Sequence, residues 1–134
     1  MQTRMTLFAI CASIIGGTNP VFAQTPLRDV VHVREGIINV GIAYEISEVC
    51  PSLSARLFRG IGFLNGLKSH ARDLGYSRDE IDDYVNDNAE KKRLEEIARG
   101  RLFDKGAIAG QPQTYCVVGR AEMAAGSDIG RLLR

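Results

Sequence analysis

The sequence contains no tryptophan and only nine phenylalanine and tyrosine residues among 134, so it lacks an aromatic platform for stacking sugars. It has two histidines, His32 and His70, without His-Glu-x-x-His or any other paired spacing. We expect both histidines to face solvent or lie near helix caps, because a metal site would require the fold to bring them together. The absence of a Cys-x-x-Cys-His run excludes covalent haem, and the absence of Cys-x-x-Cys excludes thioredoxin-type chemistry. We therefore predict no metal and no cofactor.

Long apolar runs are also missing, apart from one at the N-terminus. Arg4 precedes an apolar run from Met5 to Ile15, and Val21-Phe22-Ala23 matches the small-x-small pattern of a cleavage site. The run is shorter than the roughly 20 residues that span a bilayer, although an uncleaved anchor helix is the alternative. We predict a signal peptide over residues 1–23, cleaved after Ala23, and a periplasmic or secreted protein that does not insert into the membrane after cleavage.

An excess of either charge is missing as well. Cleavage would remove Arg4 and leave sixteen basic and sixteen acidic residues. This balance argues against a nucleic-acid partner held by bulk charge. The composition does not specify an oligomeric state.

Cysteine is scarce, and its placement is informative. Cys11 lies in the predicted signal peptide, so Cys50 and Cys116 remain. In an oxidising compartment two remaining cysteines favour a disulfide. Closing a loop of this size would stabilise the fold by about 4 kcal/mol in the loop-entropy treatment. Two free buried thiols, or a redox-active pair with Cys50 at a helix head, are the alternatives.

Hydrophobic periodicity predicts helices throughout residues 35–134, and no hairpin or repeat signal interrupts it. Residues 24–34 are predicted to be an irregular N-terminal lead-in, and 35–134 a helical domain. The predicted fold is all-α, a small single-domain bundle of five or six short helices stapled by one disulfide.

Capping signals divide this domain. The first helix is expected over residues 35–49, and the second runs from a cap at Ser52 to about residue 74. A third, short helix follows the capping box formed by Ser77 and Glu80. Two more helices are expected over 89–105 and 115–125, with a last helical turn near 129–133. The helix expected over residues 52–74 contains three glycines, Gly60, Gly62 and Gly66. They predict that another helix approaches it closely, and a ligand groove is the alternative.

Four spaced motifs carry a resemblance to a known family. They are Cys50-Pro51-Ser52-Leu53-Ser54-Ala55-Arg56, Leu74-Gly75-Tyr76-Ser77 with Glu80-Ile81 and Tyr84-Val85, Tyr115-Cys116 with Gly119 and Glu122, and Gly126-Ser127 with Ile129-Gly130 and Leu132-Leu133. In this order they resemble a domain family of unknown function found in short secreted proteins of alphaproteobacteria. The resemblance covers about residues 35–134. It implies the two-cysteine framework and a periplasmic location, and it implies no activity.

Arginines around the predicted disulfide are the candidate interaction residues. We expect them to form salt bridges with Glu122 or Glu48, and the alternative is an anionic ligand held at helix ends. Together with Glu122, the candidates are Arg56, Arg59, Arg120 and Arg131.

The absence of a catalytic motif favours a non-enzymatic binding or chaperone-like module whose partner is a periplasmic protein or an envelope component. The first alternative is a small cell-envelope enzyme, glycosidase-like, using paired carboxylates. The second is a small-ligand carrier with an apolar cavity beside the glycine-containing helix. Two close carboxylates in a cleft would favour the enzyme, and a broad exposed apolar patch would favour the binder. For the enzyme, the candidate carboxylates are Glu35, Glu45, Glu48 and Glu122.

Overall fold

The computed structural model describes residues 24–134, and the predicted signal peptide, residues 1–23, lies outside the described residues. No helix of the described part is long and apolar enough to cross a membrane. Residues 24–134 form helices and no β-strand, so the all-α prediction is confirmed. The elements are the 3-10 helix η1 (Leu27–Asp29) and the helices α1 (Val31–Val49), α2 (Leu57–Asp73), α3 (Arg78–Asn86), α4 (Asn88–Asp104), α5 (Pro112–Ala125) and α6 (Asp128–Arg131).

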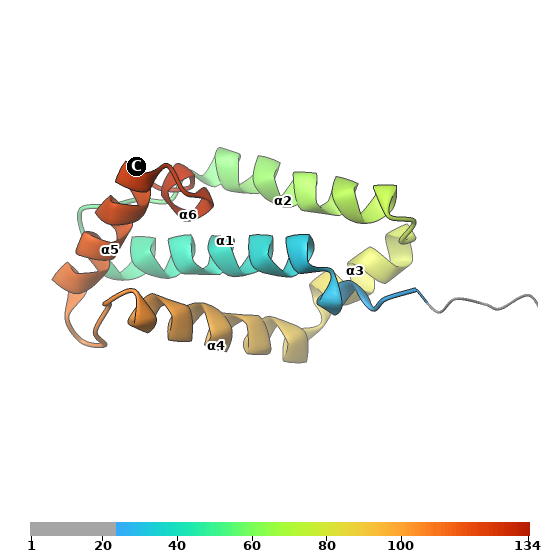
Figure 1. Cartoon of the computed structure of the whole chain (residues 1–134), viewed down its shortest axis with the longest axis horizontal. Coiled ribbons are helices and arrows are strands. Elements are labelled where there is room, and N and C mark those ends of the chain that lie inside the picture. Colours follow the sequence, from blue (N-terminus) through green and yellow to red (C-terminus); the bar gives the residue numbers. More distant parts are fainter. Residues whose placement is uncertain (1–23) are drawn as a thin grey trace, which may run out of the picture.

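Helix α1 is the centre of the fold. In Figure 1 it runs between α2 and α4, with α5 and α6 across one end and α3 at the other. Its inner positions are apolar on more than one side, because it packs against α2, α4, α5 and α6. Ile38, Ile42 and Ile46 are almost completely buried. The helix begins at Val31, so residues 31–34 of the predicted irregular lead-in are α-helical, and residues 27–29 form η1. Val33 of α1 is buried against residues of η1 and α3.

Local capping interactions mark the ends of three helices. The Ser77 hydroxyl accepts the Glu80 amide while the Glu80 carboxylate accepts the Ser77 amide, which is the predicted capping box at α3. Asp87 caps α4 by accepting the amides of Ala89 and Glu90. Gly126 ends α5 with a φ of 63°, a left-handed conformation that glycine adopts without strain.

The predicted cap at Ser52 is wrong, because α2 begins five residues later at Leu57. Residues 50–56 instead form an extended connection that pairs with the C-terminal residues. The Ser54 amide donates to the Arg134 carbonyl at 2.8 Å, and the Arg134 amide donates back at 2.9 Å. The Arg56 amide donates to Leu132 in the same way. These backbone bonds use groups that a helix would have satisfied internally. Cys50 therefore ends α1 and does not open α2.

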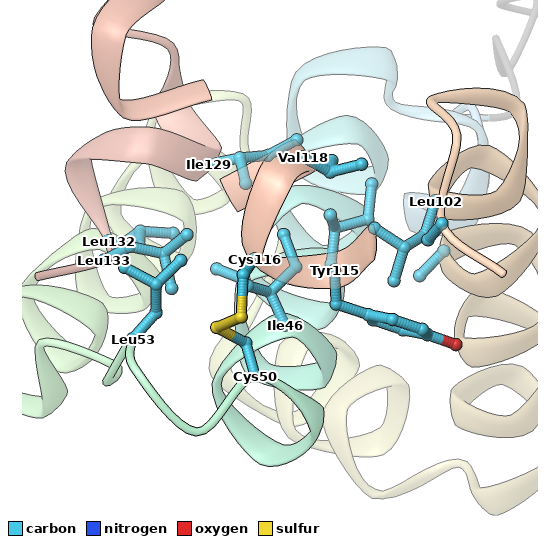
Figure 2. Close-up of a cluster of buried hydrophobic side chains, with 14 of the residues drawn as sticks. Ile46, Cys50, Leu53, Leu102, Tyr115, Cys116, Val118, Ile129, Leu132 and Leu133 are labelled. Carbon is cyan, nitrogen blue, oxygen red and sulfur yellow. A yellow bond between two sulfur atoms is a disulfide. The ribbon is translucent and has the colours of Figure 1, made fainter. Parts of the chain in front are cut away.

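The predicted disulfide joins Cys50, at the end of α1, to Cys116 in the first turns of α5, with the two Cα atoms 5.1 Å apart. Both cysteines are buried. Figure 2 shows the bond among apolar side chains from α1, the 50–56 connection, α5 and the C-terminal turn. The side chains packed with it in one core include Ile46, Leu53, Leu102, Tyr115, Val118, Ile129, Leu132 and Leu133.

The glycines of α2 do not serve the role predicted for them. A Cβ added at Gly60, Gly62 or Gly66 would meet no atom within 4 Å, so no neighbour within the described chain requires their small size. Close approach occurs instead at other glycines. A Cβ at Gly119 would lie 2.5 Å from a Leu53 methyl group, and one at Gly36 would lie 2.7 Å from Leu67.

Candidate functional site

An apolar groove runs along α1, and we call it the α2–α4 groove. Helix α1 forms its floor, α2 and α4 form its walls, and α3 closes the end near η1. Its volume is about 750 Å³. Apolar side chains that line it include Ile37, Val40, Ile61, Leu64, Leu94 and Ala98.

Charged residues of both signs lie among the groove-lining residues. Lys68 comes from α2, Glu45 from α1, and Lys91, Glu95 and Arg99 from α4. Glu45 and Arg99 approach to 4.0 Å, and both side chains keep substantial exposure. A polar rim around an apolar centre is typical of surfaces that bind macromolecules.

Apolar exposure continues beyond the groove on the first turns of α2. Ile61 lines the groove and is 57% exposed, and Phe58, three residues earlier, is 93% exposed. Only Leu67 and Ala71 of the seventeen α2 residues are buried. The helix thus presents an apolar surface that residues 24–134 do not cover, and such surfaces commonly mark binding sites.

A buried carboxylate supports the closed end of the groove. Glu90, only 3% exposed, accepts two hydrogen bonds from Arg93, at 2.8 and 2.6 Å. These bonds lower the pKa of Glu90 below its ordinary value of 4.5. The Tyr84 hydroxyl, which belongs to a groove-lining residue, donates to Glu90 at 3.5 Å. Burial, together with the Glu90 charge, raises the pKa of Tyr84 to about 12, so the phenol stays protonated.

The Glu90→Gln substitution should reveal this charge as a pH-dependent loss of stability. Because the pKa of Glu90 is lowered by folding, its contribution is present above pH 4.5 and disappears as pH falls through the folded-state pKa. We expect the variant to lose about 1 kcal/mol of unfolding free energy at pH 7. Near pH 2 the two proteins should be equally stable. Urea unfolding at both pH values measures this, and a difference that persists at low pH would contradict it.

Three of the four carboxylates considered for catalysis, Glu35, Glu45 and Glu122, have separate ion-pair partners. Hydrogen bonds from Arg101, together with Arg34, lower the pKa of Glu35. Burial raises the pKa of Glu122, but hydrogen bonds from Lys105 and Ser127 outweigh it, so the pKa is lowered overall. Both groups are therefore ionised near neutral pH. A general acid of a glycosidase needs a raised pKa.

Glu122 belongs to a second, polar cleft of about 560 Å³ where α4 meets α5 and α6. Within it Lys105 pairs with Glu122 at 2.7 Å, while Arg101 pairs with Glu35 and Asp128 pairs with Arg131. The other lining residues include Asn39, Arg101, Asp104 and Asp128. Within this cleft no buried side-chain polar atom lacks a partner.

The candidate arginines bind backbone carbonyls and not the predicted glutamates. Arg56 donates to the Leu133 carbonyl at 2.8 Å, and Arg59 donates to the Arg131 carbonyl at 3.3 Å. Arg131 itself donates to the Gly126 carbonyl and pairs with Asp128. The expected pairing with Glu122 is wrong, since that carboxylate pairs with Lys105. Arg56 and Arg59 therefore link the C-terminal residues to the start of α2, whereas the contacts of the Arg131 side chain stay within the C-terminal turn.

Arg120 lies apart from this group, beside the disulfide. It donates to the Ser52 hydroxyl at 2.8 Å, and that hydroxyl lies 3.4 Å from the Cys50 sulfur and 3.6 Å from the Cys116 sulfur. The contact covers the disulfide on its solvent side. Each of the four arginines thus has its own protein partner, and these contacts do not form a shared site for an anion.

The sequence predicts an apolar cavity beside the glycine-containing helix, and that helix, α2, does form one wall of the groove, although its glycines do not line it and the contributions of α1 and α4 have no sequence prediction. The signal was present in α1, where apolar residues occupy more positions than a single core face requires, and in the apolar Leu57, Phe58 and Ile61 of α2. Helical periodicity predicts one buried face of α2 that includes Leu57 and Ile61, but both side chains are exposed. Which of these apolar side chains remain exposed depends on the distance between α2 and α4 on either side of α1.

Comparison with known proteins gives one match. The model of a family of unknown function (DUF5333) matches residues 25–134, which is almost all of the described chain. Searches of curated proteins and of solved structures found no match. The family match covers the groove, the disulfide and the C-terminal turn together. The chain belongs to this family of unknown function.

Proposed function

We propose that this protein is a non-enzymatic binding module whose α2–α4 groove takes an amphipathic helix of a partner protein. The observation that carries the proposal is the open apolar groove of about 750 Å³, whose floor and two walls are helices. Walls of seventeen residues extend about 25 Å, the length of several helical turns. A helix laid in the groove would complete a four-helix arrangement.

The rim supports this kind of partner. An amphipathic helix brings apolar residues at i, i+3, i+4 and i+7 for the centre of the groove and charged residues along both edges. Lys68 on one wall and Glu95 and Arg99 on the other offer charges of both signs to those edges. The enzyme alternative has less support, because the lowered pKa values of Glu35 and Glu122 disfavour proton donation.

A small-ligand carrier is the second candidate, and the volume of the groove favours it. Sites for small molecules commonly occupy roughly 300–1,000 Å³. Such sites enclose most of their ligand, whereas this groove is partly open to solvent, with its lining residues Tyr44 and Ile61 both 57% exposed. We therefore place the helix partner first.

Export to an oxidising compartment is part of the proposal. The buried Cys50–Cys116 disulfide supports it, because stable disulfides form mainly outside reducing cytosol. The partner would then be a periplasmic protein or a protein component of the envelope.

The Ile61→Glu variant tests the groove. The probe is a synthetic eighteen-residue amphipathic peptide with leucines on one face, mixed Glu and Lys on the other, and one tryptophan. Since the protein has no tryptophan, the emission of the peptide alone reports its transfer into an apolar site. We expect saturable binding to the unmodified protein. A charge at the exposed Ile61 should weaken binding about tenfold or more, or roughly 1.4 kcal/mol, without unfolding the protein.

Val117→Glu is the matched control. Val117 is 64% exposed on α5 and does not line the groove, so this variant should bind the peptide normally. Equal weakening in both variants, or no saturable binding, would overturn the helix-binding proposal. Binding of an anilinonaphthalene dye but not the peptide would favour the small-ligand carrier. A sedimenting dimer that Ile61→Glu splits would assign the groove to a second copy of this chain.

A further inference from the structure

The two histidines of this chain lie in contact, although they are 38 positions apart and the sequence predicts them to be separate. His32 lies in the first turn of α1, and His70 lies in the last turn of α2. Their ring centroids are 4.6 Å apart, and the ring planes make an angle of 68°. Both residues lie within helices, so the packing of α2 on α1 places the two imidazoles side by side.

The separation suits two imidazoles bound to one metal ion. A nitrogen–metal bond of about 2.0–2.1 Å places the ion about 3.2 Å from the centre of each ring. For ligand angles of roughly 90–110°, two ring centres then lie about 4.5–5.2 Å apart. The observed 4.6 Å falls within this range. Because the last torsion of histidine is broad, either ring can turn a nitrogen toward the common point.

Access and chemistry are also suitable. His32 is exposed and His70 is half-buried, so an ion can reach the pair from solvent. Within residues 24–134 no group of three or more metal-ligating side chains comes together, so the remaining positions would be filled by water. Imidazole favours copper, zinc and nickel, and affinity for divalent ions of the first row peaks at Cu²⁺.

We propose that His32 and His70 form a two-imidazole site for a divalent transition-metal ion, with Cu²⁺ bound most tightly. The bound ion joins the start of α1 to the end of α2, two helices otherwise held together by packing. Neither histidine lines the α2–α4 groove, so this site and the proposed peptide binding are tested by separate variants.

Pulsed electron paramagnetic resonance of the untagged protein with one equivalent of Cu²⁺ gives a direct test. The chain has only two histidines, so every imidazole signal comes from this pair. We expect the combination lines that arise when two imidazoles ligate one ion. His32→Ala and His70→Ala should each leave a single imidazole and weaken Cu²⁺ binding more than tenfold, since loss of a supporting outer partner alone costs 10–100-fold.

Thermal unfolding with Zn²⁺ provides the second measurement. An ion that binds only the folded protein raises the unfolding temperature, and the increase should vanish in either variant. His32 is exposed, so His32→Ala should unfold normally without metal, as circular dichroism can verify. A Cu²⁺ spectrum with one imidazole or none in the unmodified protein, or a Zn²⁺ effect that survives in both variants, would overturn the proposal.

Discussion

Replacing both Cys50 and Cys116 with alanine is expected to lower the free energy of unfolding by about 4 kcal/mol. The bond joins residues separated by 66 positions in the sequence. In the loop-entropy treatment, removing such a cross-link raises the conformational entropy of the unfolded chain and so stabilises the unfolded state by about 4 kcal/mol. Domains of this size are typically stable by only about 5–15 kcal/mol. Both sulfurs are buried among the core residues of Figure 2, so small cavities would add to the loss. The variant should be close to unfolding at physiological temperature.

Urea unfolding of the variant and of the unmodified protein, each with and without reductant, measures the effect. Reductant should reduce the stability of the unmodified protein once it reaches the buried bond, and it should leave the alanine variant unchanged. We choose alanine because a buried serine hydroxyl would need its own hydrogen-bond partner. A loss below about 1 kcal/mol would show that packing holds the α1–α5 junction without the disulfide.

Gly130→Ala is expected to cost more than about 3 kcal/mol, above the usual range for overpacking. A Cβ at Gly130 would lie 2.5 Å from the amide nitrogen of Met123 and closer still to the carbonyl oxygen of Glu122. These are backbone atoms of α5, which cannot move aside as a flexible side chain can. The substitution should therefore push α6 off α5. The pairing of the C-terminal residues with the 50–56 connection should be lost with it.

Gly100→Ala is the matched control. Gly100 lies within α4, and a Cβ there would meet no atom within 4 Å. Alanine at this exposed helical position should raise stability by about 0.5–1 kcal/mol. The urea midpoint should fall for Gly130→Ala and rise for Gly100→Ala relative to the unmodified protein. Equal effects of the two substitutions would mean that the α5–α6 contact contributes nothing to folding.

Those features of the fold that depend on residues close together in the sequence could be predicted from the sequence. The capping box at Ser77 and Glu80, the Asp87 cap and the left-handed Gly126 each depend on groups within a few residues. The disulfide was predictable from counting, since one pairing remains for two cysteines. Periodicity was sufficient for the all-helical class.

What could not be predicted depends on contacts between distant segments. Ser52 has the chemistry of a cap, but the C-terminal residues pair with the backbone around it and keep it out of a helix. The groove depends on the spacing of α2 and α4 over α1, and the contact of His32 with His70 depends on how α2 lies along α1. Neither spacing has a local signal in the sequence.

The sparse packing of α2 has a consequence for what the groove can accommodate. Helix α1 touches most of the fold, whereas α2 buries only Leu67 and Ala71 and packs mainly on α1 and α3. Segments with few buried contacts open by local unfolding at a lower free energy than the core does. Amide hydrogen exchange should therefore be faster in α2 than in α1. One wall of the groove can then shift while the other stays fixed, so under the proposed helix binding the local stability of α2 would govern the range of helix diameters that fit.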